Sequence, residues 1–145
     1  MKIIANNKKA RHDYNLLETY EAGISLQGTE VKSLRLGKCS IKEAYVQIKK
    51  EEAWLMGATI PQYTHGNRYN HQEQRSRRLL LHKKEIKKIE IEIKTQRVSV
   101  IPTKIYFSKG KVKLEIALGK SKKKYDKRQE DMKKAIEKKL RQGDY

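Results

Sequence analysis

Histidine and cysteine are the residue types in this chain that could carry catalysis or bind a metal. His65 and His71 lie six residues apart in a polar stretch, a spacing that matches no standard metal site, and no carboxylate accompanies them at ligand spacing. The single Cys39 excludes an internal disulfide and a zinc cluster of cysteines. A histidine pair can cleave RNA by general acid–base chemistry, so a ribonuclease is the competing enzyme class. We expect no enzyme, no metal and no cofactor.

Basic residues interleaved with Tyr and His form the stronger chemical pattern. The chain has 35 Lys and Arg against 17 Asp and Glu, which gives a formal net charge of +18. A surplus of this size repels itself in the compact state and is typical of proteins that bind a polyanion. The mixture of cations and rings suits phosphate contact together with stacking on unpaired bases. The composition therefore favours RNA binding, with a merely soluble basic protein as the alternative.

Nothing in the sequence indicates export or a membrane span. Met1–Ala10 contains Lys and Asn but lacks the apolar region of a signal peptide. No window approaches the 18 apolar residues that a membrane-spanning helix needs. Together with the single cysteine, these features predict a cytoplasmic protein.

The elements that would position an RNA divide the chain into two parts. Residues 1–118 alternate apolar and polar residues over short runs and are expected to form one RNA-binding domain. Residues 119–145 form a lysine-rich tail in which Met132, Ile136 and Leu140 make one thin apolar stripe. A stripe this narrow cannot hold a helix firmly on a core. We therefore expect the tail to be disordered alone and helical when bound.

The first part is predicted to be mainly β with inserted helices. About six short strands with turn residues between them indicate a small OB-like closed β-barrel. Strand is predicted at Tyr14–Leu17, Gly23–Leu26, Tyr45–Ile48, Ala53–Gly57, at Val98–Ile101 and Thr103–Phe107 on either side of Pro102, and at Lys111–Leu118. Tyr20–Gly23 is expected to be a turn, Ser108–Gly110 a hairpin loop, and Pro102 the site of a bulge or an edge position.

Two helices and two irregular segments complete this picture. The first helix is expected to begin at Thr29 as N-cap and to end at Gly37. The second is Ile86–Lys94, whose isoleucines fit helical spacing as well as strand alternation. Asn6–Asp13 is predicted to be a mobile arm, and Gln62–Ser76 a long polar loop with a function.

Five stretches recur, in the same order, in one protein family: Asn6–Tyr14, Glu21–Gly37, His65–Asn70, Arg75–Lys83 and Lys122–Arg128. On these residues the chain resembles the SmpB family, the SsrA-binding proteins of bacterial trans-translation. The combination of EAG with LQGTEVKSLR is the most specific part of the resemblance, which covers most of the chain. It implies an OB-like barrel and an RNA-binding function without catalysis.

The resemblance also implies the partners. The protein would bind the tRNA-like domain of tmRNA (SsrA RNA) and deliver it to the A site of a stalled ribosome, with its tail in the empty mRNA channel. Elongation factor Tu would be an indirect partner through aminoacylated tmRNA, no membrane would be involved, and the protein would be a monomer. The competing function is that of a generic OB-fold single-stranded nucleic-acid-binding protein, which would bind DNA and unstructured RNA equally well.

By motif, the resemblance assigns tmRNA binding to seven residues of the first part: Arg11, His12, Glu21, Lys32, Arg35, Leu80 and His82. Glu21 would accept a hydrogen bond from a base or orient neighbouring basic groups, and Leu80 would pack against a base or belong to the core. His82 replaces an Asn that many family members have. The RNA backbone would be contacted by Arg11, His12, Lys32 and Arg35. For His12, stacking on a base is the alternative.

At the start of the tail, the resemblance implies contacts with the decoding centre and the mRNA channel of the ribosome by Lys122, Lys123, Lys124, Tyr125, Asp126, Lys127 and Arg128. Tyr125 would stack on a base of the small-subunit RNA, and Lys127 and Arg128 would neutralise phosphates. Asp126 is expected to cap the bound helix.

Overall fold

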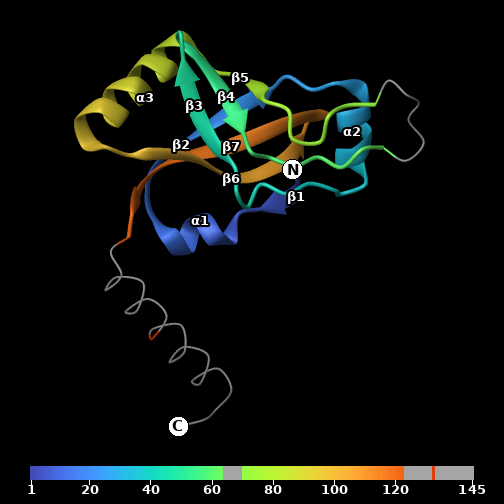
Figure 1. The fold of residues 1–145 in the computed structure, drawn as a ribbon, viewed down its shortest axis with the longest axis horizontal. Helices are drawn as coiled ribbons and strands as arrows, with labels where there is room; N and C mark the ends of the chain where they lie inside the picture. Colours follow the sequence, from blue (N-terminus) through green and yellow to red (C-terminus); the bar gives the residue numbers. More distant parts are fainter. Residues whose placement is uncertain (64–69, 123–131, 133–145) are drawn as a thin grey trace.

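A single antiparallel sheet of seven strands organises the part of the chain that the structure describes. The structure is a computed structural model that describes residues 1–63, 70–122 and 132. The strands follow the order β1-β6-β7-β2-β5-β4-β3 across the sheet (Figure 1). Their bounds are β1 Lys2–Asn6, β2 Tyr14–Ile24, β3 Tyr45–Lys49, β4 Glu52–Met56, β5 Arg77–Leu80, β6 Ser99–Ser108 and β7 Lys111–Ser121, and the helices are α1 Lys8–Asp13, α2 Gly28–Arg35 and α3 Lys83–Gln96.

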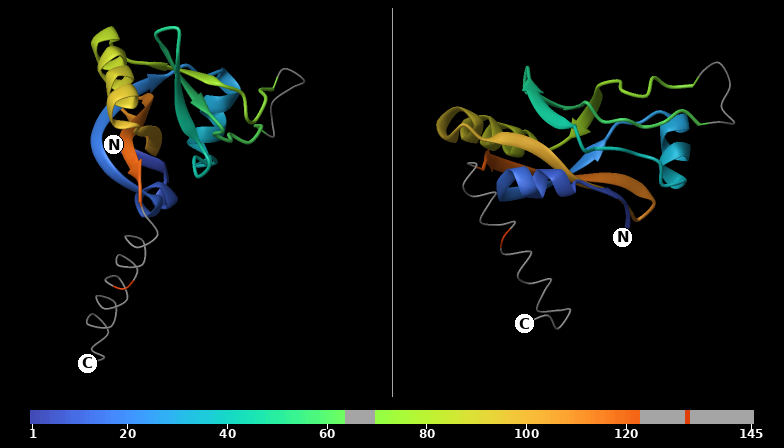
Figure 2. Two further views of the ribbon diagram at one scale, coloured as in Figure 1. Left: turned by 60° about the vertical axis from the view of Figure 1, so that its left-hand side comes forward. Right: turned by 60° about the horizontal axis from the view of Figure 1, so that its bottom comes forward.

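The sheet has a longer half, β1, β6, β7 and β2, and a shorter half, β5, β4 and β3. The halves join where β2 pairs with β5, in the register Gly23↔Leu80 and Ile24↔Leu79. In Figure 2 the β3–β4 hairpin diverges from the strands of the longer half. The mainly β architecture with inserted helices is as predicted.

The predicted closed barrel is wrong, because the sheet is open in the described residues. β1 and β3 are its two edges, and no ladder joins β3 to another strand besides β4. β1 pairs with Lys104–Phe107 of β6, so the first half of β6 has β7 as its one strand neighbour. Pro102 in that half has no N–H to donate. β3 packs beside this half of β6 without pairing with it, and Val46 and Val100 are among the residues that line a hollow between the two strands.

The expected mobile arm at Asn6–Asp13 is instead ordered structure. It contains the end of β1 and all of α1. The buried Asn7 side chain accepts from the N–H of Ala10 and donates to the carbonyls of Ile41 and Pro102, at 3.1, 3.1 and 2.8 Å. One amide therefore caps α1 and attaches it to two segments that are distant in sequence. Polar composition alone did not indicate these partners.

Two pairs of predicted strands are continuous in the structure. β2 runs without a turn through Tyr20–Gly23, and β6 runs through Pro102 with the predicted irregularity between Pro102 and Lys104. The β3–β4 hairpin and the β6–β7 hairpin are confirmed. Lys109 and Gly110 have φ of 52° and 77°, as a two-residue hairpin loop requires. β7 continues to Ser121, beyond the predicted boundary at Leu118.

Both predicted helices are confirmed, although α2 begins with different residues. Gln27 is its N-cap, and the Glu30 carboxylate accepts the N–H of Gln27 at 2.7 Å, so Thr29 is not the cap. α3 buries Ile86 and Ile89 against the sheet. The described helices include none that is both long and apolar enough to cross a membrane.

A buried ion pair between α2 and β5 fixes the junction of the two halves. Glu30 and Arg77 have fully buried side chains, and their Oε2 and Nε atoms are 2.5 Å apart. The remaining guanidinium N–H groups of Arg77 donate to the carbonyls of Ala58, Gln72, Glu73 and Arg75. Every donor of this buried cation therefore has an acceptor, as a stable buried charge requires.

Arg75 and His71 connect the segment before β5 to α2. Arg75 donates to the second oxygen of Glu30 at 2.6 Å. His71 is buried between the hydroxyl of Thr29 and the carbonyl of Ile60, each at 2.8 Å. His71 was one member of the histidine pair that a ribonuclease would use, but both of its ring nitrogens bond within the protein. The polar loop is anchored by groups that look solvent-exposed in sequence.

We predict that Glu30→Gln destabilises the fold far more than Glu43→Gln. The first variant leaves Arg77 as a buried cation without its counter-ion, which typically costs about 3–5 kcal/mol. Glu43 and Lys9 form an ion pair at 2.7 Å with side chains 71% and 44% exposed, and exposed pairs contribute about 0–1 kcal/mol. Urea unfolding followed by circular dichroism at neutral pH measures both.

The same variant has a defined pH dependence. Burial opposes ionisation of Glu30, but hydrogen bonds from Arg75, the Gln27 N–H and Arg77 outweigh it, so its pKa is lowered. Its contribution to stability is present above the pKa of an unfolded Glu, about 4.3, and is lost as pH falls through the folded value. The difference in the free energy of unfolding between wild type and Glu30→Gln should become smaller in acid. A constant difference across the acid range would contradict this assignment.

Candidate nucleic-acid interface

A surface hollow of about 440 Å³ forms where β2, β5 and the start of α3 meet. It brings together three residues that the sequence assigned to RNA contact, Glu21, Leu80 and His82, which are up to 61 positions apart in the chain. Each comes from a different element, and the β2–β5 pairing sets their spacing. The other residues at its wall are Gly23, Glu51, Glu52, Arg78, Leu79, Leu81, Glu85, Ile86 and Lys113.

Glu21 is held in place by a tyrosine two strands away in the sheet. The Tyr106 hydroxyl of β6 donates to Oε2 of Glu21 at 2.5 Å, while Glu21 itself is exposed. Burial and the nearby Glu21 carboxylate raise the pKa of Tyr106, so its proton stays on the hydroxyl at any physiological pH. One oxygen of the carboxylate is thereby fixed, and the group is oriented before any ligand arrives.

Leu80 lies over Gly23, and this close approach explains why a glycine occupies that position of β2. A Cβ at Gly23 would come within 3.2 Å of the Leu80 Cβ, closer than most van der Waals contacts. The Leu80 side chain is 56% exposed, so the alternative that it belongs to the core is wrong. Its exposed apolar surface suits contact with the face of a base. Gly23 is therefore a strand residue of close approach, and the turn expected there does not form.

His82 is the N-cap of α3, and its backbone N–H donates to the Glu85 carboxylate at 3.1 Å. Asn, which the resemblance places here in many relatives, is among the best N-cap residues. In this chain the carboxylate of Glu85 stabilises the helix start instead. The His82 side chain is exposed at the wall of the hollow and can donate a hydrogen bond to a ligand.

The hollow is acidic although the protein is strongly basic. Four carboxylates line it, from Glu21, Glu51, Glu52 and Glu85, against the cations Arg78 and Lys113. Carboxylates accept hydrogen bonds from the amino groups of bases and repel phosphates. The local chemistry therefore suits the edges of bases better than it suits phosphates.

The other four predicted tmRNA contacts lie in two further places. Arg11 and His12 are on α1, where the Lys122 Nζ donates to the Arg11 carbonyl at 3.2 Å and the Lys122 N–H to the Asp13 carbonyl at 2.9 Å. They therefore neighbour the start of the tail. Lys32 and Arg35 are exposed on α2, at the right of Figure 1. None of the four lines the acidic hollow.

Lys32 has a partner in the structure. Its ammonium lies 5.6 Å from the centre of the Tyr63 ring, within the range of a cation–π contact. Of the seven residues predicted to contact the ribosome, Lys122 alone is described. Lys123, Lys124, Tyr125, Asp126, Lys127 and Arg128 lie outside the described residues.

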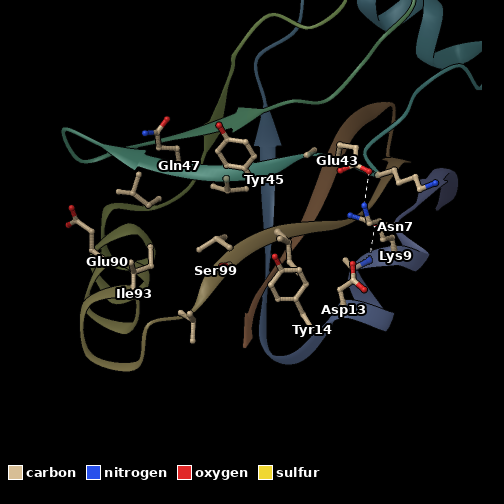
Figure 3. A pocket seen from close by; sticks show the side chains of 18 of the residues that line it. Asn7, Lys9, Asp13, Tyr14, Glu43, Tyr45, Gln47, Glu90, Ile93 and Ser99 are labelled. Atoms are coloured by element: carbon tan, nitrogen blue, oxygen red, sulfur yellow. Dashed lines mark hydrogen bonds and ion pairs between the residues drawn. The ribbon is translucent and has the colours of Figure 1, made fainter. Parts of the chain in front are cut away.

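A second hollow, of about 650 Å³, lies between β3, α1, α3 and the first half of β6. Figure 3 shows Tyr45 and Gln47 of β3 above Ser99 and Tyr14, with Glu90 and Ile93 of α3 on one side. None of the predicted contact residues that the structure describes lines it. Across the described parts of the chain, no three His, Cys, Asp or Glu residues cluster closely enough to hold a metal ion.

Local sequence patterns did not indicate that Tyr106, Arg78 and Lys113 belong to the site. Each precedes or follows an apolar residue in a strand, and alternation alone assigns such positions to an outer face without saying what they contact. Their roles depend on strand order, because Lys113 pairs with both Gly23 and Tyr106 across neighbouring strands. Strand order is a long-range property that local patterns do not specify.

The chain is similar to known proteins over nearly its whole length. The profile of the family described as SmpB protein matches residues 4–143. The SsrA-binding protein of Thermosipho africanus is 55% identical over 141 residues, covering 97% of this chain and 95% of its own. That of Mycolicibacterium paratuberculosis is 50% identical over 129 residues, covering 89% of this chain and 76% of its own.

A solved structure described as "tmRNA-SmpB: a journey to the center of the bacterial ribosome" contains a similar chain. It is 42% identical, superposes with a TM-score of 0.69, and the match covers 91% of this chain and 93% of that one. Sequence and fold therefore agree over nearly the whole length. On this evidence the chain belongs to the SmpB family.

Proposed function

We propose that this chain binds the tRNA-like domain of tmRNA and delivers it to stalled ribosomes, where trans-translation follows. The relatives that match over nearly the whole chain are SsrA-binding proteins, and the similar solved chain is an SmpB bound with tmRNA in a ribosome. The single structural observation in favour is the hollow that unites Glu21, Leu80 and His82. The protein recognises RNA and performs no catalytic step itself.

Recognition of the RNA divides between the hollow and the basic surface. Unpaired bases of the tRNA-like domain enter the hollow, where the fixed Glu21 carboxylate accepts from base amino groups and Leu80 covers a base face. Lysines outside the hollow neutralise the phosphates, and the net charge of +18 draws the RNA in. This division supports a shape-specific RNA partner over the generic single-strand binder.

The C-terminal segment performs the ribosomal part of the function. The tail beyond Lys122 becomes helical on binding and enters the mRNA channel, with Tyr125 on a base of the decoding centre and Lys127 and Arg128 on phosphates; residues 119–121, which the sequence assigned to the tail, belong to β7. The position of Lys122 beside α1 supports this division, because Arg11 and His12 then act at the root of that segment. The chain works as a cytoplasmic monomer, and elongation factor Tu engages it through aminoacylated tmRNA.

We predict that tmRNA remains bound at salt concentrations that release single-stranded DNA. Charge alone gives affinities that fall together, with a log–log slope of about −0.7 to −0.9 per phosphate neutralised. Base contacts in the hollow add a term that does not depend on salt. Filter binding of the full chain to the tRNA-like domain, to an elongator tRNA and to single-stranded DNA across a salt series measures this. Parallel loss of all three ligands would make the chain a generic polyanion binder.

Leu80→Ala is expected to weaken binding of the tRNA-like domain by about 5-fold, because it removes exposed apolar contact worth about 1 kcal/mol. Leu17→Ala is the matched control, because Leu17 is a leucine of β2 that is 52% exposed and does not line the hollow. Both variants should unfold at the wild-type urea concentration. Equal affinities of the two variants would remove Leu80 from the interface.

The triple replacement of Asp126, Lys127 and Arg128 by alanine is expected to leave tmRNA affinity unchanged and to abolish tagging of stalled peptides. The reason is that these residues act on the ribosome, whereas the hollow holds the RNA. Binding to the tRNA-like domain and tagging in a reconstituted translation system are measured in parallel. Normal tagging by the triple variant would show that the proposed division of roles is wrong.

A further inference from the structure

Trp54 is the one tryptophan of the sequence, and sequence analysis gave it no role. It lies on β4, opposite Gln47 of β3 and Arg78 of β5. Side chains of directly opposed residues point to the same face of a sheet, and residues two apart on a strand share that face. Trp54, Arg78 and Leu80 therefore lie on one face, and Trp54 is partly exposed there.

A hollow of about 380 Å³ lies over this tryptophan. Its walls are formed by Gln47, Lys49, Lys50, Glu52, Trp54, Met56 and Ser76. Glu52 also lines the hollow that contains Glu21, Leu80 and His82. The two hollows are therefore neighbours on a continuous surface that crosses β4, β5 and β2.

The spacing between them fits a bound strand of RNA. Neighbouring strands of a sheet are about 4.8 Å apart, so β4 is about 10 Å from β2. A base at Leu80 and Gly23 would place its flanking nucleotides within reach of Trp54. An aromatic face with apolar Met56 beside it accepts any base, because every base has a flat face to stack.

The charges at this place suit the backbone of such a strand. Lys49 and Lys50 line the hollow, and Arg78 forms a 3.5 Å ion pair with Glu52 in which the side chains are 54% and 40% exposed. An exposed pair of this kind contributes little to stability. Arg78 can therefore exchange Glu52 for a phosphate at small cost, while Glu52 alone opposes the anion among the hollow's walls.

We propose that Trp54 is a stacking platform for an unpaired base of the bound RNA, next to the hollow that contacts bases through Glu21 and Leu80. The inference rests on the proposed RNA-binding function and adds a subsite to it. Lys49, Lys50 and Arg78 hold the phosphates of the stacked nucleotide. The chemistry selects for a ring and is tolerant of which base provides it.

The sole tryptophan makes the subsite directly observable. We titrate the full chain with the tRNA-like domain, with oligoadenylate and with heparin, and follow tryptophan emission excited at wavelengths that tyrosine does not absorb. Binding itself is followed independently by anisotropy of labelled RNA and by competition for heparin. Stacking quenches the emission with both RNAs, whereas heparin binds the same cations without a base and leaves the emission unquenched.

Two substitutions separate the ring from its volume. Trp54→Leu removes the stacking face and is expected to weaken RNA binding by about 5- to 150-fold, the range found for loss of one base–aromatic stack. Trp54→Phe retains a ring and should stay much nearer to wild type. Urea unfolding of both variants shows whether a loss of RNA affinity comes from a destabilised fold. A damaged fold would also lower the affinity for heparin.

Unchanged emission at saturating RNA, or equal RNA affinities of Trp54→Leu and wild type, would overturn the inference while leaving the proposed function intact. If the wild-type chain binds the tRNA-like domain no more tightly than it binds heparin, the proposed function is wrong, and the subsite falls with it. The emission and the affinity of the wild type thus distinguish the two failures.

Discussion

The buried pair of Glu30 and Arg77 is the constraint on which the rest of this structure depends. Two opposite charges without solvent are stable together only when their remaining hydrogen-bonding groups are also satisfied. Arg77 meets this condition with four main-chain carbonyls, which come from Ala58, just after β4, and from the segment before β5. The pair therefore determines where α2, β4 and β5 lie relative to one another. Because β5 is only four residues long, this polar anchor positions a strand that ladder hydrogen bonds alone would hold weakly.

The candidate interface is built on that anchored strand. Arg77 points into the core, so its neighbours Arg78 and Leu80 occupy the outer positions of β5. β5 also joins the halves of the sheet, and the absence of a side chain at Gly23 allows Leu80 to lie across the junction. Tyr106 then fixes Glu21 from two strands away. The buried ion pair on one face of β5 thus determines the geometry of the candidate interface on the other face, although neither residue of the pair is exposed.

Local sequence patterns correctly predicted the helices and hairpins whose conformation is determined by residues close together in the sequence. The β3–β4 and β6–β7 hairpins, α2 and α3 follow from alternation, turn residues and helical spacing within a few residues. Errors arose where a distant partner decides the conformation. Asn7 orders the supposed arm through Ile41 and Pro102, and His71, Glu30 and Arg77 are buried although their types favour solvent. The open edge between β3 and β6 likewise depends on long-range packing. Of the candidate site, the resemblance identified Glu21, Leu80 and His82, while Tyr106 required the strand order.

The contrast between a net charge of +18 and an acidic hollow explains how such a protein can be both fast and selective. Cations spread over a surface attract every nucleic acid, and their effect weakens with salt and carries no information about sequence or shape. Carboxylates inside the hollow oppose phosphates and reward base amino groups that have left a duplex. A uniformly basic hollow would bind any backbone more tightly and would lose this distinction. In the binding mode proposed above, the carboxylates that line the hollow beside Leu80 lower the affinity for polyanions in general and favour RNA that presents unpaired bases at that point of the surface.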